Sequence, residues 1–530
     1  YDWSHHPILF APHNPGELLV GANVVFQSMD DGATWKVISP DLTRNDKSKQ
    51  TRPGGPISAD VTSEESFDAI SALAVSPLSD QVIWSGADDG LVYVTQDGGG
   101  HWDKVLPKGM PEWATVTCIE PSHTEAGTAY VTASRYMWDD FKPYIYKTTD
   151  FGKHWTTISA GLPDNQYLES VREDPDAPNL LFAGTSYSVF MSLDAGAHWL
   201  PLALNLPSVR VSDIAIQPEQ HAVVLATHGR AFWTLDNLQF LEQLSKAQVD
   251  SDAVYLFKPQ QTWLVTRATG GPEPAKPNEG TNLPPGATVF FNLPANYDGN
   301  TPVTLTFTST DGKTITQFTL PEKDAKTHKV KDPLHAGMNR FQWNLRYANA
   351  VEVKGIFNSD FAAAIPIGPE VVPGTYDAVL AYRGQKVTQP FEVKLDPRLT
   401  ATQAQLQERL DVLMQIHTAL NNLDTTLNQA IDTRADLEKS SSGSAKKPLA
   451  ALNNDIEDLV NLKIQSGEGA LVYPGKLRGW LTSIADDIGM AFVPPNAAQS
   501  EVAKTYVDQA QQGVTRLQAD IAQAQAALKK

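Results

Sequence analysis

Two adjacent carboxylates, Asp88 and Asp89, are the residues of this sequence best suited to general acid–base chemistry. They end an apolar stretch, in the run Gly86-Ala87-Asp88-Asp89-Gly90. Hydrolysis of a glycosidic bond needs two carboxyl groups, about 5–5.5 Å apart for retention of configuration or about 6.5–9.5 Å apart for inversion. Asp88 and Asp89 are therefore our catalytic candidates if the protein is a hydrolase. The alternative, which we prefer, is that they form a hairpin turn.

A partner carboxylate for such a pair is not evident from the sequence. The candidates are Asp139, Asp140, Glu64 and Glu65. Sialidase chemistry is disfavoured, because it would call for an Arg-Ile-Pro motif and the sequence has none.

Five further residues are predicted to contact a ligand from loops on the same side of the fold as Asp88. They are Asn23, Arg135, Tyr187, His228 and Arg230. A histidine and an arginine two residues apart can hold an anionic group, such as a peptide carboxylate or an acidic sugar. The alternative for His228 and Arg230 is a loop that hydrogen-bonds to its neighbour.

A phrase of the form Ser/Thr-x-Asp-x-Gly-x-x-Trp occurs four times and indicates the elements that position these loops. Its Asp can accept backbone N–H groups across a turn, its Gly supplies a positive φ, and its Trp offers apolar area to a seam between sheets. We predict that these residues stabilise the fold and do not catalyse. The four sets are Asp30, Gly32 and Trp35; Asp97, Gly99 and Trp102; Asp150, Gly152 and Trp155; and Asp194, Gly196 and Trp199.

The spacing of the phrase predicts a partial β-propeller over residues 1–245. The last two copies lie 44 residues apart, which matches a propeller blade of about 40–50 residues. Apolar strands predict about five blades, starting near residues 8, 69, 115, 167 and 211. The fifth lacks an outer strand and ends in a short helix near Phe240–Leu244. We therefore expect an upstream propeller half, as a separate or processed chain, to complete the ring.

The rest of the chain divides into three parts. Residues 246–285 read as a connector, and residues 286–396 alternate apolar and polar side chains at period two, which predicts a β-sandwich of immunoglobulin or fibronectin III character. Residues 397–530 carry apolar stripes at helical spacing, which predict a helical bundle. Two capping boxes are expected there, Thr400 with Gln403 and Asn496 with Gln499.

Composition excludes several function classes. The 530 residues carry a net charge of −19, which disfavours nucleic acid and anionic membranes as partners. No apolar run reaches the roughly 18 residues of a membrane span. The single cysteine, Cys118, allows no internal disulfide. We expect no cofactor and no metal site, since His101, His154 and His198 merely precede the repeated Trp; calcium at a turn such as Asp30-Asp31-Gly32 is the weak alternative.

Several longer runs resemble one family. Trp84-Ser85-Gly86-Ala87-Asp88-Asp89-Gly90, the run Thr227-His228-Gly229-Arg230-Ala231-Phe232-Trp233 and the run Pro373-Gly374-Thr375-Tyr376 are similar to motifs of secreted bacterial BNR or Asp-box propeller proteins of the sortilin type, often labelled glycosyl hydrolases. The chain resembles the C-terminal half of such a protein. The loop at Asp88 also resembles the Asp-bearing loop of Asp-box xyloglucanases.

Taken together, these patterns favour a secreted binding or assembly protein, periplasmic or on the surface of a bacterium. A glycoside hydrolase acting on a polysaccharide at the propeller mouth is the first alternative. A sortilin-like peptide binder is the second. The ligand would be a carbohydrate or a peptide.

Overall fold

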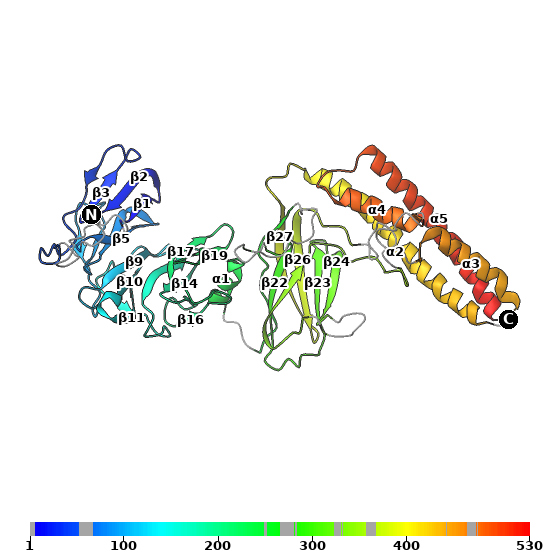
Figure 1. Cartoon of the computed structure of the whole chain (residues 1–530), viewed down its shortest axis with the longest axis horizontal. Coiled ribbons are helices and arrows are strands. Elements are labelled where there is room, and N and C mark those ends of the chain that lie inside the picture. Colours follow the sequence, from blue (N-terminus) through cyan, green and yellow to red (C-terminus); the bar gives the residue numbers. More distant parts are fainter. Residues whose placement is uncertain are drawn as a thin grey trace, which may run out of the picture. The chain divides into compact units, whose positions relative to one another are not determined.

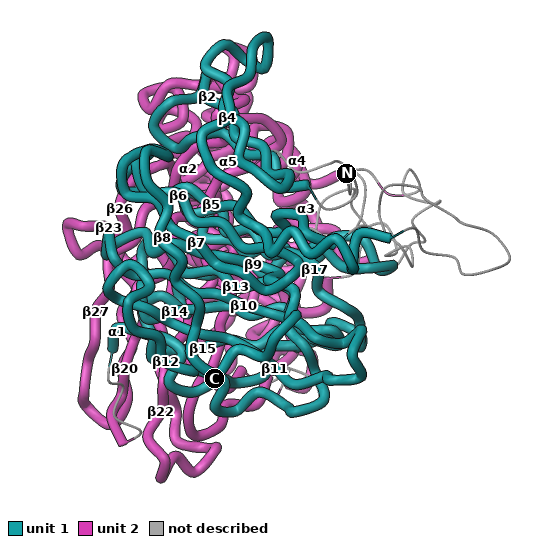
Figure 2. Tube along the Cα trace, turned by 90° about the vertical axis from the view of Figure 1, so that its left-hand side faces the viewer, with its two compact units in different colours: residues 1–249 teal, residues 250–530 magenta. Residues whose placement is uncertain are grey.

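The computed structural model describes residues 6–51, 67–247, 252–265, 280, 283–322, 330, 332–356, 367–440, 443–463, 473 and 475–529. The chain divides into two compact units, residues 1–249 and 250–530 (Figure 2).

Unit 1 consists of five antiparallel sheets that follow one another along the chain (Figure 1). We call them blades one to five. In each blade the strands pair in sequence order, as in a meander. Blade one contains β1 (Ile8–Ala11), β2 (Asn14–Gly21), β3 (Val25–Ser28) and β4 (Lys36–Val37). Blade two contains β5 (Ile70–Ser76), β6 (Ser79–Ala87), β7 (Val92–Thr95) and β8 (Asp103–Lys104). Blade three contains β9 (Thr115–Pro121), β10 (Ala129–Arg135), β11 (Asp140–Thr148) and β12 (Thr156–Thr157). Blade four contains β13 (Leu168–Asp174), β14 (Ala177–Thr185), β15 (Val189–Ser192) and β16 (Leu200–Pro201).

Blade five has three strands, β17 (Val211–Gln217), β18 (Ala222–Thr227) and β19 (Phe232–Leu235). The chain then enters helix α1 (Leu238–Lys246), near the short helix that the sequence predicts. Leu238 and Leu241 of this helix are buried in the core shared by blades four and five. The helix therefore covers an end of that core where a fourth strand does not follow.

Successive blades pack face to face. The first strands of neighbouring blades contact each other, β5 with β9, β9 with β13 and β13 with β17. Separate apolar cores fill the seams; Trp84, for example, is fully buried in the seam of blades two and three. Since both faces of β6 are covered, its run Val82–Ala87 is buried at every residue. This stacking of four-stranded meanders is that of propeller blades.

Unit 2 begins with a sandwich of two sheets. One sheet has the order β20-β22-β25 and the other β21-β27-β26-β23-β24. Its core stacks Phe307 on Trp343, with ring centroids 4.2 Å apart. Two strands, β20 and β21, come from the segment read as a connector, and each extends one of the sheets. The strands are β20 (Tyr255–Leu256), β21 (Thr262–Leu264), β22 (Ala287–Leu293), β23 (Val303–Ser309), β24 (Thr314–Leu320), β25 (Gly337–Trp343), β26 (Gly374–Tyr382) and β27 (Gln385–Leu395).

In its described residues unit 2 continues with the α-helices α2 (Gln403–Lys439), α3 (Lys446–Leu459), α4 (Leu477–Gly489) and α5 (Ala497–Leu528). The capping box of α5 at Asn496 and Gln499 is confirmed. That of α2 was misplaced: Thr402 and Gln405 form it, two residues beyond the predicted pair. None of the helices described is long and apolar enough to cross a membrane.

Candidate functional site

The predicted ligand-binding and catalytic residues of unit 1 share one side of the blades. Because strands alternate in direction, the loops after each second strand lie on one side, and the turns after each first and third strand lie on the other. We call these the loop side and the box side. On the loop side, Asn23 follows β2, the Asp88-Asp89 pair follows β6, Arg135 ends β10, Tyr187 follows β14, and His228 and Arg230 follow β18.

The carboxylates of Asp88 and Asp89 are both occupied by backbone donors. Asp88 Oδ1 accepts the N–H groups of Asp68 and Ala69, each at 3.0 Å. Asp89 accepts the N–H groups of Arg44 and Leu91. The pair thus fastens the loop side of blade two to the segments before and after residues 52–66. Asp88 and Asp89 lie in the hairpin loop between β6 and β7, in which Gly90 has a φ of 87°.

Burial raises the pKa of both carboxyl groups above the ordinary value for an aspartate. Asp89 is fully buried and Asp88 is half-buried. Burial raises the pKa of Asp88 to about 7, and the charge of Asp89 adds to the rise. The pKa of Asp89 is raised to about 6, chiefly by burial and in part by the carboxyl group of Asp68. A carboxyl group that is still protonated near neutral pH can act as a general acid.

Asp68 is the carboxylate beside this pair that the sequence did not single out. It is 6% exposed, and its Oδ2 accepts a hydrogen bond from Gln50. Its position directly before the first strand of blade two was the available signal. Of the predicted partners, Asp139 and Asp140 lie instead at the loop of blade three, whereas Glu64 and Glu65 lie outside the described residues.

We expect Asp88→Asn to change how stability depends on pH. The pKa of Asp88 is higher in the folded chain than its ordinary 3.8, so between about pH 4 and pH 7 the folded state holds a proton that the unfolded state has lost. Stability from this group therefore falls as pH rises through that window. An amide can keep both backbone hydrogen bonds without this penalty. Relative to wild type, the variant should gain on the order of 1–4 kcal/mol between pH 4 and pH 8, measured by urea unfolding; an identical pH profile would contradict the buried charge.

Asn23 contacts a residue that follows β4 of the same blade, whereas Arg135 makes contacts within its own loop. The Asn23 amide donates to Asp41 at 3.0 Å. Arg135 lies 3.8 Å from the Asp140 carboxylate and its guanidinium stands over the ring of Trp138 at 5.5 Å. Both side chains therefore organise loops, and Arg135 in addition holds an exposed aromatic ring.

Exposed aromatic side chains gather at the loop side of blades three and four. Tyr136 stacks on Tyr167 with centroids 4.8 Å apart, and Phe141 packs against the same ring. Trp138 is 47% exposed and Tyr187 is 53% exposed. Aromatic rings with free faces are typical of binding surfaces.

A pocket of about 310 Å³ adjoins this aromatic surface. Tyr187 and Ser188 of the β14–β15 loop form one wall, and Leu206 and Pro207 of the linker to blade five contribute to its lining. Its size lies at the lower end of small-molecule sites. The remaining lining residues are Asn165, Gln166, Ala203 and Ser208.

His228 and Arg230 are exposed at the loop of blade five. The backbone N–H of His228 donates to the Arg210 carbonyl, while the described residues offer neither side chain a hydrogen-bond or ion-pair partner. The Trp233 indole fixes the loop by donating to the Arg230 carbonyl at 2.9 Å. The imidazole of His228 and the guanidinium of Arg230 therefore face solvent.

The repeated phrase forms the same turn in all four copies. In blade two, Thr95 donates to Asp97 Oδ1 at 2.8 Å, and that oxygen also accepts the His101 N–H at 2.8 Å. Gly99 donates its N–H to Thr95 Oγ1 at 3.0 Å. The equivalent bonds recur around Asp30, Asp150 and Asp194.

The Trp of the phrase ties each blade to the one before it, with one exception. Trp102 Nε1 donates to the Ile38 carbonyl of blade one at 3.1 Å. Trp155 donates likewise to Val105, and Trp199 to Ile158. Trp35 of blade one makes no such bond in the described part of the chain and is 45% exposed.

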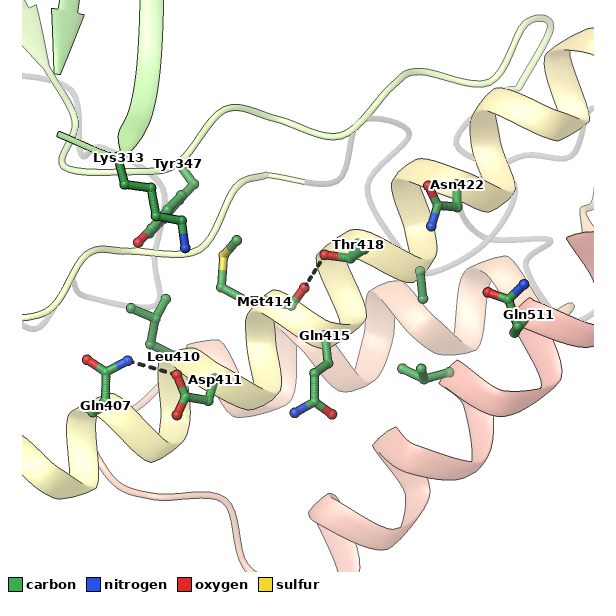
Figure 3. A pocket seen from close by; sticks show the side chains of 12 residues that line it. Lys313, Tyr347, Gln407, Leu410, Asp411, Met414, Gln415, Thr418, Asn422 and Gln511 are labelled. Atoms are coloured by element: carbon green, nitrogen blue, oxygen red, sulfur yellow. Dashed lines mark hydrogen bonds between the residues drawn. The ribbon is translucent and has the colours of Figure 1, made fainter. Parts of the chain in front are cut away.

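A second pocket, of about 700 Å³, lies in unit 2. Figure 3 shows Lys313 and Tyr347 of the sandwich loops opposite residues of α2 such as Met414. Gln407 donates to Asp411 at 2.8 Å along its edge. Both polar and apolar side chains line this pocket, and we assign it no chemistry.

No protein-family model matches the chain, and no curated protein matches it in sequence. Among solved structures, the GH74 xyloglucanase from Xanthomonas campestris is similar at 21% identity and a TM-score of 0.34, over 44% of this chain and 36% of that one. An ancestral GH74 enzyme is similar at 11% identity and a TM-score of 0.34, over 73% and 46%. YCF48 from Cyanidioschyzon merolae is similar at 18% identity and a TM-score of 0.26, over 31% and 52%. The chain spans less than two thirds of the length of each.

Proposed function

We propose that this chain is part of a secreted, propeller-based binding protein in which a further blade-like segment, upstream of the chain or on a partner, covers blade one. The single observation that carries the proposal is the contrast between Trp35 and the other repeat tryptophans. Trp102, Trp155 and Trp199 each cap a preceding blade, whereas Trp35 has its indole exposed. A secreted location rests on the sequence resemblance alone.

The repeat glycines support the same proposal. A Cβ at Gly99 would lie 2.5 Å from the Ile38 carbonyl oxygen of the preceding blade. Gly152 and Gly196 face Val105 and Ile158 of their preceding blades equally closely. Gly32 meets only residues of its own blade, Trp35 and Leu18. In three copies of the phrase the glycine therefore lies directly against the preceding blade. In the first copy no residue of another blade lies against Gly32 within the described part of the chain.

Both ends of the array leave apolar surface uncovered. On β1, Ile8 is 65% exposed and Phe10 is 60% exposed, whereas β5 of blade two has no exposed residue. On β19, Phe232 is 77% exposed. Exposed apolar strands at the end of a sheet stack are normally covered by another chain or segment.

Hydroxyl-radical footprinting tests the proposal with an internal control. We expect Trp35 to oxidise much faster than Trp102 in the isolated chain, because only Trp102 is buried. In protein isolated from its native source, Trp35 should be protected to the level of Trp102. Protection of Trp35 in the isolated monomer, or its continued reactivity in the native assembly, would contradict the proposal.

For the ligand, we propose that the aromatic surface around Tyr187, with the pocket beside it, is the binding face. Exposed rings can stack on a sugar or a peptide side chain, and the free Arg230 guanidinium can pair with an acidic group. Asp88 and Asp89 are given a structural role, since each accepts two backbone N–H groups.

A glycoside hydrolase is the second candidate, and the raised pKa of Asp88, about 7, favours it. A screen of plant and microbial polysaccharides separates the two. A binding protein should retain polysaccharides without releasing reducing ends, and Tyr187→Ala should weaken retention while Asp88→Asn leaves it unchanged. Turnover that disappears in a folded Asp88→Asn variant would instead establish the hydrolase.

A further inference from the structure

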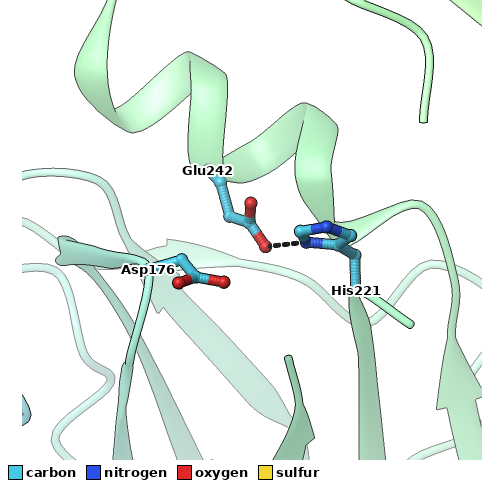
Figure 4. Close-up of side chains that lie close together, drawn as sticks. All are labelled: Asp176, His221 and Glu242. Atoms are coloured by element: carbon cyan, nitrogen blue, oxygen red, sulfur yellow. Dashed lines mark hydrogen bonds and ion pairs between the residues drawn. The ribbon is translucent and has the colours of Figure 1, made fainter. Parts of the chain in front are cut away.

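Three potential metal ligands from separate elements converge on the box side of blades four and five (Figure 4). Asp176 comes from the β13–β14 turn, His221 from the β17–β18 turn and Glu242 from helix α1. One ligand atom of each lies within 4.8 Å of those of the other two. Among the described residues they form the one such group of histidine, cysteine and carboxylate side chains.

The backbone holds this group in place. His221 adopts a left-handed conformation, with φ of 49°, and its carbonyl accepts the Leu238 N–H that starts α1. Glu242 lies one turn further along the helix and is 5% exposed. Its carboxylate and His221 Nδ1 are 2.7 Å apart. The imidazole and the buried carboxylate are thus aligned before any ligand arrives.

A third carboxylate, that of Asp174, provides an independent indication that this region could hold a cation. Asp174 is 1% exposed, and its Oδ2 has no hydrogen-bond partner within the described residues. Its other oxygen accepts the Asp176 N–H at 2.9 Å, and the negative charge of Glu242 acts directly on it. A buried carboxylate oxygen without a partner is costly unless a cation or a donor satisfies it.

We propose that Asp176, His221 and Glu242 bind one divalent metal ion of the zinc class. An imidazole nitrogen combined with carboxylate oxygens is a donor set that Zn²⁺ accepts, at metal–ligand distances of about 2.0–2.2 Å, and that Ca²⁺, which prefers oxygen only, does not favour. The ion replaces the hydrogen bond between His221 and Glu242. It joins α1 to the turns of blades four and five and so fastens the end of the blade array.

Isothermal titration of the untagged, EDTA-treated chain with Zn²⁺, and separately with Ca²⁺, tests the proposal. We expect one Zn²⁺ per chain with an affinity at least about tenfold above that for Ca²⁺, and a higher melting temperature with Zn²⁺. His221→Ala and Asp176→Asn should each weaken Zn²⁺ binding by at least about tenfold and abolish the shift in melting temperature. Asp176 is exposed, so its variant should fold even if the histidine variant does not.

Glu219→Gln is the matched control, because Glu219 is exposed on the same turn as His221. It should bind Zn²⁺ as the wild type does. Weak binding at the exposed histidine–carboxylate pairs of the repeats, such as His154 with Asp150, would survive all three variants. If Zn²⁺ binding is absent, or is fully retained in Asp176→Asn, the site does not exist.

Discussion

Replacing Trp102 by alanine is expected to lower the free energy of unfolding of unit 1 by about 3–5 kcal/mol, the usual range for a large buried aromatic side chain. Trp102 is 8% exposed and packs in the core between blades one and two. The substitution also removes the indole N–H that donates to the Ile38 carbonyl, so that this carbonyl loses a hydrogen-bond donor. Urea unfolding followed by far-ultraviolet circular dichroism measures the loss.

Trp35→Ala is the matched control for this variant, because it alters the same position of the same turn. Trp35 is 45% exposed and no preceding blade receives its N–H in the described residues. Its substitution should cost about 1 kcal/mol or less in the isolated chain. Equal losses in the two variants would show that Trp35 is buried too, and would remove the main support for a missing blade.

The second large effect is expected in the helical part of unit 2, where Arg478 and Asp424 form a buried ion pair. Both are at most 1% exposed, and Arg478 Nε lies 3.1 Å from Asp424 Oδ1. Burial raises the pKa of Asp424, and the charge of Arg478 opposes that rise. Arg478→Met removes the cation and leaves a carboxylate buried, so we expect a loss of about 3–5 kcal/mol, measured by urea unfolding at 222 nm.

The double variant Asp424→Val with Arg478→Met separates the pair's net contribution from the cost of breaking it. Replacing both charges by apolar side chains of similar volume is often close to neutral. We therefore expect the double variant to recover most of the stability lost by Arg478→Met alone. A double variant as unstable as the single one would mean that Arg478 acts through its other contacts rather than through Asp424.

The sequence by itself predicted the blades, because their signal is local. The phrase around Asp97 needs only residues within seven positions to close its turn, and strands such as β6 are apolar along their whole length because both faces are covered. For the same reason the sequence predicted that blade five has no fourth strand and that a short helix follows its third strand. The cap of α2 was misplaced by two residues, since Thr400 and Thr402 both precede a glutamine at the right spacing and only the backbone path chooses between them.

Only the tertiary structure decided what the loop side and the box side bring together. The carboxyl group of Asp68 acts on that of Asp89, 21 positions later in the chain, and the pKa values of Asp88 and Asp89 depend on burial that no spacing encodes. Trp35 and Trp102 occupy the same position of the repeated phrase, yet Trp35 is 45% exposed and Trp102 only 8%. Asp176, His221 and Glu242 meet because two turns and a helix converge. Side chains so far apart along the chain become one site through packing between blades, which a local pattern cannot report.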